Sequence, residues 1–131
     1  MSAATPAQLA RLQRLAQLKS DLEMRRFSAY RSRVEVAQGQ ISAIQQDLQA
    51  IYASTSAFSI EEARLANALA GERSRALLRA EQALQQMLPG FETARQAAIR
   101  EFGRVEVLRS VRDDLLARKL RDADRKSSTS Q

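Results

Sequence analysis

Residues 84–94 read LQQMLPGFETA and place Pro89 and Gly90 side by side in a stretch that otherwise has a helical composition. A proline inside a helix removes a backbone donor and clashes with the preceding turn, which costs about 3 kcal/mol. A glycine adds roughly 1 kcal/mol. The fold depends on whether the chain reverses here, giving a three-helix bundle, or whether one long helix continues through both residues.

The first helix has a well-marked N-terminus. Thr5 is an N-cap residue, Pro6 occupies the first helical position, and Gln8 completes a capping box. Core positions then follow at three- and four-residue spacing, with one residue skipped after the first four. They are Leu12, Leu15, Lys19 and Leu22, followed by Phe27, Tyr30, Val34, Ala37, Ile41, Ile44, Leu48, Ile51, Thr55 and Phe58. The pattern predicts a coiled-coil helix over about 6–54.

Serine and threonine residues end this helix, and a second capping box begins another. The sequence ASTSAFS favours a turn over 55–59. Ser59 and Glu62 form the capping box of a helix expected over about 60–125, followed by a disordered polar tail at 127–131. The expected core positions of this helix are Leu65, Leu69, Leu77, Ala80, Leu84, Met87, Phe91, Ala94, Ala98, Val105, Leu108 and Leu115.

A short turn makes consecutive helices antiparallel neighbours. With the turn centred near residue 57, facing residues have numbers that sum to about 114. Pro89 and Gly90 then lie opposite residues 24–25, where the first helix skips a position. We therefore expect an all-α fold, a long antiparallel two-helix coiled-coil hairpin over 1–126, with the second helix longer and kinked at the Pro-Gly pair.

The same register leaves residues 109–126 without a partner helix. The chain carries a net charge of +6, and this segment has seven basic and four acidic residues, a net charge of +3. Its apolar stripe consists of Val111, Leu115, Leu116 and Leu120. A single exposed helix with an apolar stripe is unsatisfied without a partner, so the sequence predicts an interaction end here.

Composition argues against catalysis and metal binding. The chain has no Cys and no His, which removes disulfides, thiolate ligands, and the commonest general base and metal ligand. No phosphate-binding glycine loop, zinc motif or EF-hand loop occurs. The acidic pairs are interpreted as a helix cap and as surface ion pairs, namely Glu61 and Glu62, Asp113 and Asp114, and Asp122 and Asp124. We expect no enzyme, no catalytic residue, no cofactor and no metal.

The sequence also favours a cytoplasmic location. No apolar run approaches the roughly 20 residues of a membrane span, and the first residues lack the apolar core of a secretory signal.

Four arginines are a candidate phosphate-binding cluster, Arg25, Arg26, Arg31 and Arg33. They are interpreted as a solvated helix face, because nucleic-acid sites usually interleave aromatic residues or carry a steeper excess of charge.

Residues 9–41, LARLQRLAQLKSDLEMRRFSAYRSRVEVAQGQI, form Leu-, Arg- and Gln-rich heptads, and residues 106–128, EVLRSVRDDLLARKLRDADRKSS, form an Arg-rich final helix. This layout resembles the FliJ family of flagellar export proteins and the YscO-type proteins of injectisomes. The resemblance implies a stalk that regulates a flagellar or type III protein-export ATPase. Its terminal helix ends would insert into the hexameric ATPase, and the far part of the hairpin would contact the membrane export gate at the inner membrane. Some members of the family also bind export chaperones.

The resemblance places the ATPase-binding end at 6–20 and 100–126. The expected contact residues are Arg11, Arg14, Arg109, Arg112, Leu116, Arg118, Lys119 and Arg121. Two other classes stay open. A coiled-coil adaptor or dimeric four-helix bundle draws support from Leu9, Leu18 and Val36, which lie off the predicted core stripe. An Arg-rich nucleic-acid binder is disfavoured because charge is spread along both helices, so we expect no nucleic-acid partner. We expect the protein to be a monomer or a weak homo-oligomer.

Overall fold

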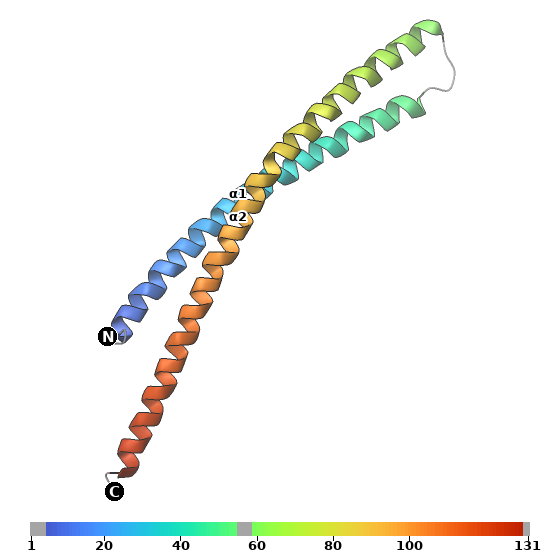
Figure 1. Ribbon diagram of the computed structural model, residues 1–131. Coiled ribbons are helices and arrows are strands. Elements are labelled where there is room, and N and C mark those ends of the chain that lie inside the picture. The colour runs from blue at the N-terminus through green and yellow to red at the C-terminus, as the bar shows by residue number, and fades with distance from the viewer. Residues whose placement is uncertain (1–4, 55–58, 130–131) are drawn as a thin grey trace. The chain divides into compact units, whose positions relative to one another are not determined.

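A computed structural model describes residues 5–54 and 59–129 (Figure 1). The described residues form two helices, α1 (Pro6–Ala53) and α2 (Ile60–Thr129), which pack against each other, and they form no strand. The all-α helical hairpin predicted from the sequence is therefore confirmed. Most of the predicted turn, residues 55–58, lies outside the described residues.

Both helices begin where their capping signals indicate. The backbone N–H of Thr5 donates to Gln8 Oε1 at 2.9 Å, and the backbone N–H of Gln8 donates to Thr5 Oγ1 at 3.2 Å. At the start of α2, the backbone N–H of Glu62 donates to Ser59 Oγ at 3.2 Å. Each of these bonds provides an acceptor for a backbone N–H at the start of a helix, where the helix itself offers no carbonyl acceptor.

The helix α2 continues without interruption through Pro89 and Gly90, so the chain does not reverse there. Pro89 has no N–H to donate to the carbonyl of the residue four positions before it. On the following turn, the hydroxyl of Thr93 donates to the carbonyl of Pro89 at 3.0 Å. The predicted three-helix alternative is therefore excluded, while the bend at this site stays a prediction.

The end of α2 lies further along the chain than expected. The helix reaches Thr129 and so includes part of the segment 127–131 that was predicted to be disordered. The hydroxyl of Thr129 donates to the carbonyl of Lys126 at 3.1 Å. The last four carbonyls of a helix lack an N–H donor within it. The carbonyl of Lys126 is one of these, and the Thr129 hydroxyl provides it with a donor. Residues 130–131 lie outside the described residues.

The chain divides into two compact units, each containing a segment of both helices. Unit 1 consists of Met1–Phe27 and Ala94–Gln131, and unit 2 consists of Ser28–Thr93. Within each unit the two helix segments run antiparallel.

Ion pairs between α1 and α2 give the register within each unit. In unit 1, Lys19 Nζ lies 3.4 Å from Glu101 Oε1, and in unit 2, Arg73 Nη1 lies 3.7 Å from Asp47 Oδ2. The residue numbers of each pair sum to 120, whereas the predicted sum was about 114. The predicted register is therefore wrong by almost two helical turns.

The register differs from the prediction because the pairing with α1 begins later along α2 than a turn centred near residue 57 implies. Position 67 faces Ala53, the last residue of α1, so residues 60–66 of α2 extend past the end of α1. In agreement, Ile60 and Leu65 are 75% and 62% exposed. Leu65 was predicted as a core residue, and it stays exposed because it lies one position before Ala66, which is covered.

Except for Ala10, the covered positions of α1 form a single coiled-coil seam without the predicted skip. They alternate at four- and three-residue spacing throughout and are Leu9, Gln13, Ala16, Ser20, Glu23, Phe27, Tyr30, Val34, Ala37, Ile41, Ile44, Leu48 and Ile51. Leu12, Leu15 and Leu22, predicted as core, are instead largely exposed. The helical period fixes which side of α1 faces α2. The seam position four residues before Phe27 is therefore Glu23, although its side chain is charged.

The seam of α2 agrees more closely with the prediction. The predicted core positions that are covered are Leu77, Ala80, Leu84, Met87, Phe91, Ala94, Ala98, Val105, Leu108 and Leu115. At the start of the helix, Ala66 and Ala70 are covered in place of Leu65 and Leu69. Glu101 occupies the seam position between Ala98 and Val105, and this polar position was not predicted.

Gly90 lies directly against Tyr30 in unit 2. A Cβ atom on Gly90 would lie 2.6 Å from the phenol oxygen of Tyr30 and 2.9 Å from its nearest ring carbons. The guanidinium carbon of Arg33 lies 4.2 Å from the centre of the same ring. Gly90 therefore faces Tyr30 and not residues 24–25 as predicted, and the missing side chain makes room for the ring.

Gly90→Ala is expected to lower the free energy of unfolding by about 1 kcal/mol, because overpacking costs 1–3 kcal/mol and exceeds the roughly 1 kcal/mol gained in helix propensity. The matched control is Gly39→Ala, since a Cβ on Gly39 meets nothing within 4 Å. This control is expected to raise the free energy of unfolding by about 1 kcal/mol. Urea unfolding followed by circular dichroism measures both, and equal stabilisation would contradict the packing role of Tyr30.

Candidate protein-interaction surfaces

The C-terminal part of α2 extends past the start of α1 within unit 1 (Figure 1). The side chain of Arg112 donates to Gln13 Oε1 at 3.2 Å, and Leu115 is the last partly covered residue of the helix. All of residues 116–129 are exposed. The segment without a partner helix, here named the C-terminal overhang, is thus 116–129 and not 109–126, as a result of the shifted register.

The C-terminal overhang is both basic and partly apolar. Over its length of about 21 Å it carries five basic and two acidic residues. Leu116 and Leu120 are 48% and 69% exposed. Arg118, Lys119 and Arg121 form no ion pair within the described part of the chain. These cations are therefore available to a partner, and the two leucines offer it an apolar contact.

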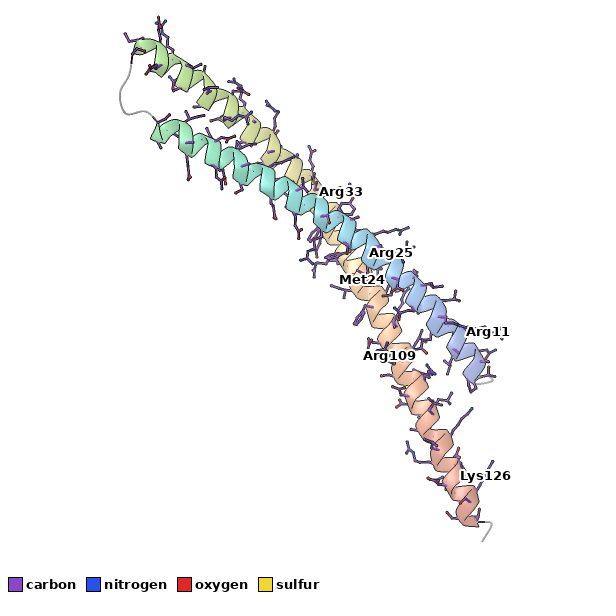
Figure 2. All side chains as sticks on the ribbon, turned by 180° about the vertical axis from the view of Figure 1, so that it is seen from behind. Arg11, Met24, Arg25, Arg33, Arg109 and Lys126 are labelled. Carbon is purple, nitrogen blue, oxygen red and sulfur yellow. The ribbon has the colours of Figure 1, made fainter. Side chains whose placement is uncertain are left out.

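The other basic residues predicted for the ATPase-binding end lie in the part of unit 1 where α1 and α2 are paired. Figure 2 labels Arg11 on α1 and Arg109 on α2, both exposed. Arg109 forms an ion pair with Glu106 at 3.2 Å. Arg14 and Arg112 line a common surface hollow of about 430 Å³. The structure thus brings Arg14 and Arg112 together and leaves the cations of the overhang as a separate group.

Unit 1 also contains an apolar groove that was not predicted. It has a volume of about 690 Å³ and runs between α1 and α2. Its lining residues are Leu12, Leu15, Ala16, Lys19, Arg100, Glu101, Gly103, Arg104, Val107 and Leu108. The signal for it was present in the sequence, since Leu12, Leu15 and Lys19 belong to the stripe that was assigned to the core.

A buried carboxylate connects the two walls of this groove. The side chain of Glu101 is only 7% exposed and lies 3.4 Å from Lys19 Nζ and 3.0 Å from Arg104 Nη1. A buried carboxylate without cations is strongly unfavourable, so the two basic side chains compensate its charge. Both cations remain 56% exposed and can therefore still contact a ligand at the edge of the groove.

The arginines considered for phosphate binding are mostly engaged by local groups. Three of the four have such contacts: Arg26 with Glu23 at 3.0 Å, Arg31 with Glu35 at 3.1 Å, and Arg33 with the ring of Tyr30 at 4.2 Å. These contacts favour the interpretation as a solvated helix face over a phosphate-binding cluster.

Within residues 5–54 and 59–129, no three acidic side chains are grouped so that they could hold a metal ion. Neither of the two described helices has a stretch apolar enough to cross a membrane. The chain shows no significant match to protein-family models, curated proteins or solved structures with which it was compared.

Proposed function

We propose that this protein is a non-enzymatic stalk and regulator of a flagellar or type III protein-export ATPase. The terminal helical end of unit 1 inserts into the ATPase hexamer on the cytoplasmic side of the inner membrane. The end of unit 2 that carries the helix connection contacts the membrane export gate, and export chaperones are further partners.

The C-terminal overhang is the observation that carries this proposal. An isolated helix with exposed leucines gains stability when a partner covers it. Its unpaired cations Arg118, Lys119 and Arg121 add attraction to an acidic surface, such as an acidic channel through a protein ring. Continuity of α2 from Ile60 to Thr129 supports the proposal further, because a single helix can transmit torque or displacement along its length.

Addition of this protein to the purified export ATPase of the same organism is expected to raise the rate of ATP hydrolysis, and deletion of residues 116–131 is expected to abolish the increase. The deletion removes no described contact with α1, so helix content and unfolding midpoint should remain close to those of the full chain. A more selective variant reverses the three overhang cations together, R118E/K119E/R121E, and is also expected to abolish the increase.

The matched control reverses three exposed arginines of unit 2, R64E/R75E/R79E, which changes the net charge by the same amount. This control is expected to stimulate hydrolysis as the unaltered protein does. Full stimulation by the truncated chain, or equal loss in the two charge-reversed variants, would contradict insertion of the overhang.

A coiled-coil adaptor is the second candidate, and exposed apolar side chains favour it. Leu18 and Val36 are 66% and 62% exposed. This exposure agrees with their predicted positions off the core stripe. Leu9, the third residue in that argument, is instead buried against α2 at 8% exposure. An adaptor would bind a partner helix without altering ATP hydrolysis, so the hydrolysis assay separates the two functions.

A further inference from the structure

We propose that the apolar groove of unit 1 binds an acidic amphipathic helix of a partner protein. The groove lies within the ranges 6–20 and 100–126 of the proposed ATPase-binding end, but it contains none of the eight contact residues expected there. The inference therefore goes beyond the proposed function. Its walls come from α1 and α2, and it is open along one side of their seam.

Side-chain spacing indicates that the occupant is a helix. Beside its seam, α1 carries a second stripe at three- and four-residue spacing: Leu12, Leu15, Lys19 and Leu22. On α2 the corresponding stripe is Arg100, Arg104, Val107 and Val111. Two helices that each carry a second heptad-spaced stripe on the same side form the receiving surface of a three-helix coiled coil.

The chemistry of the stripes specifies the partner. Leu12, Leu15 and Val107 are 48%, 64% and 62% exposed, and they offer apolar contact to leucine-like side chains of a third helix. The cations Lys19, Arg100 and Arg104 lie along the same groove, where the single acid Glu101 faces two of them. Arg100 has no ion pair with any described residue. A helix with acidic residues flanking its apolar stripe therefore complements the groove.

Charge argues against a second copy of this chain as the occupant. In a symmetric dimer the same surface of both copies would meet, which would bring two sets of groove cations together. The C-terminal overhang of another copy is an alternative apolar helix, but it carries five basic and two acidic residues. Either arrangement places like charges opposite each other, so an acidic partner is favoured.

Binding of a fluorescent synthetic helix to the full chain tests this inference without any ATPase. The probe is an amphipathic peptide with leucines at heptad spacing and glutamates at the flanking positions, and the comparison peptide has lysines in place of the glutamates. Fluorescence anisotropy is expected to show binding of the glutamate peptide and at least about ten-fold weaker binding of the lysine peptide.

Substitutions of matched exposure locate the binding surface. Leu15→Asp and Val107→Asp place charges in the groove and are each expected to weaken binding of the glutamate peptide at least about ten-fold. The controls Leu18→Asp and Ile99→Asp alter side chains of similar exposure, 66% and 57%, that do not line the groove. They are expected to leave binding unchanged, and circular dichroism verifies the helix content of all four variants.

Charge reversal tests the choice of an acidic partner. Arg100→Glu is expected to weaken binding of the glutamate peptide and to strengthen binding of the lysine peptide. Equal binding of both peptides to the unaltered protein, or equal loss in groove and control variants, would overturn the proposal. Sedimentation equilibrium of the protein alone adds a further outcome, because a dimer that Leu15→Asp dissociates would assign the groove to a second copy.

Discussion

Pro89→Ala is expected to raise the free energy of unfolding by about 3 kcal/mol, the penalty of a proline in a helix interior relative to alanine. The substitution restores an N–H at position 89 and removes the ring that clashes with the preceding turn. Pro89 is exposed in the middle of α2, so alanine loses little packing there. The measurement is urea denaturation followed by circular dichroism, with the slope of the transition compared between variants.

The control for this substitution is Pro6→Ala, at the other proline of the chain. Pro6 is the first residue of α1, where a backbone N–H has no helical acceptor and the fixed proline geometry suits the helix. We expect its replacement to change the free energy of unfolding by less than about 0.5 kcal/mol. A similar effect of both substitutions would show that position within the helix is not the cause.

The double variant Lys19→Met/Arg104→Met is expected to lower the free energy of unfolding by about 3 kcal/mol, because it leaves the Glu101 carboxylate buried without a cation. Each single variant is expected to cost less than about 1 kcal/mol, since the remaining cation still compensates the charge. The two substitutions should therefore be strongly non-additive. Denaturant unfolding of the unaltered protein, both singles and the double measures the coupling.

Two further variants separate charge burial from loss of packing. Adding Glu101→Met to the double variant removes the isolated carboxylate and is expected to restore most of the lost stability, because apolar side chains of similar volume replace buried ion pairs with little loss. Arg109→Met removes the exposed pair with Glu106 and is expected to change stability by less than about 1 kcal/mol. Additive effects of Lys19→Met and Arg104→Met would contradict the buried-carboxylate explanation.

Little of the interaction surfaces could be predicted residue by residue. The cations Arg118, Lys119 and Arg121 follow from the basic composition of the chain end, and the structure leaves them exposed beyond α1. The groove was missed because Leu12 and Leu15 are strongly apolar, and apolar spacing alone assigned them to the core. No local rule shows that the exposed leucines border a seam made of Gln13, Ala16 and Ser20.

The sequence by itself determined the helices and their starts. Capping depends on groups three residues apart, as between Thr5 and Gln8 or Ser59 and Glu62, so a local pattern is sufficient to predict it. The same holds for the heptad spacing from Phe27 to Ile51, because the helical period is a property of each helix alone.

Only the tertiary structure decided how the two helices align. The register depends on how far α2 extends past Ala53 before pairing begins, and a turn sequence does not encode that length. With the register shifted, Gly90 meets Tyr30 and Glu101 meets Lys19. Continuity of one seam along α1 then places polar and small residues inside and leaves neighbouring leucines outside, because a helix cannot change its facing side without a break in its period.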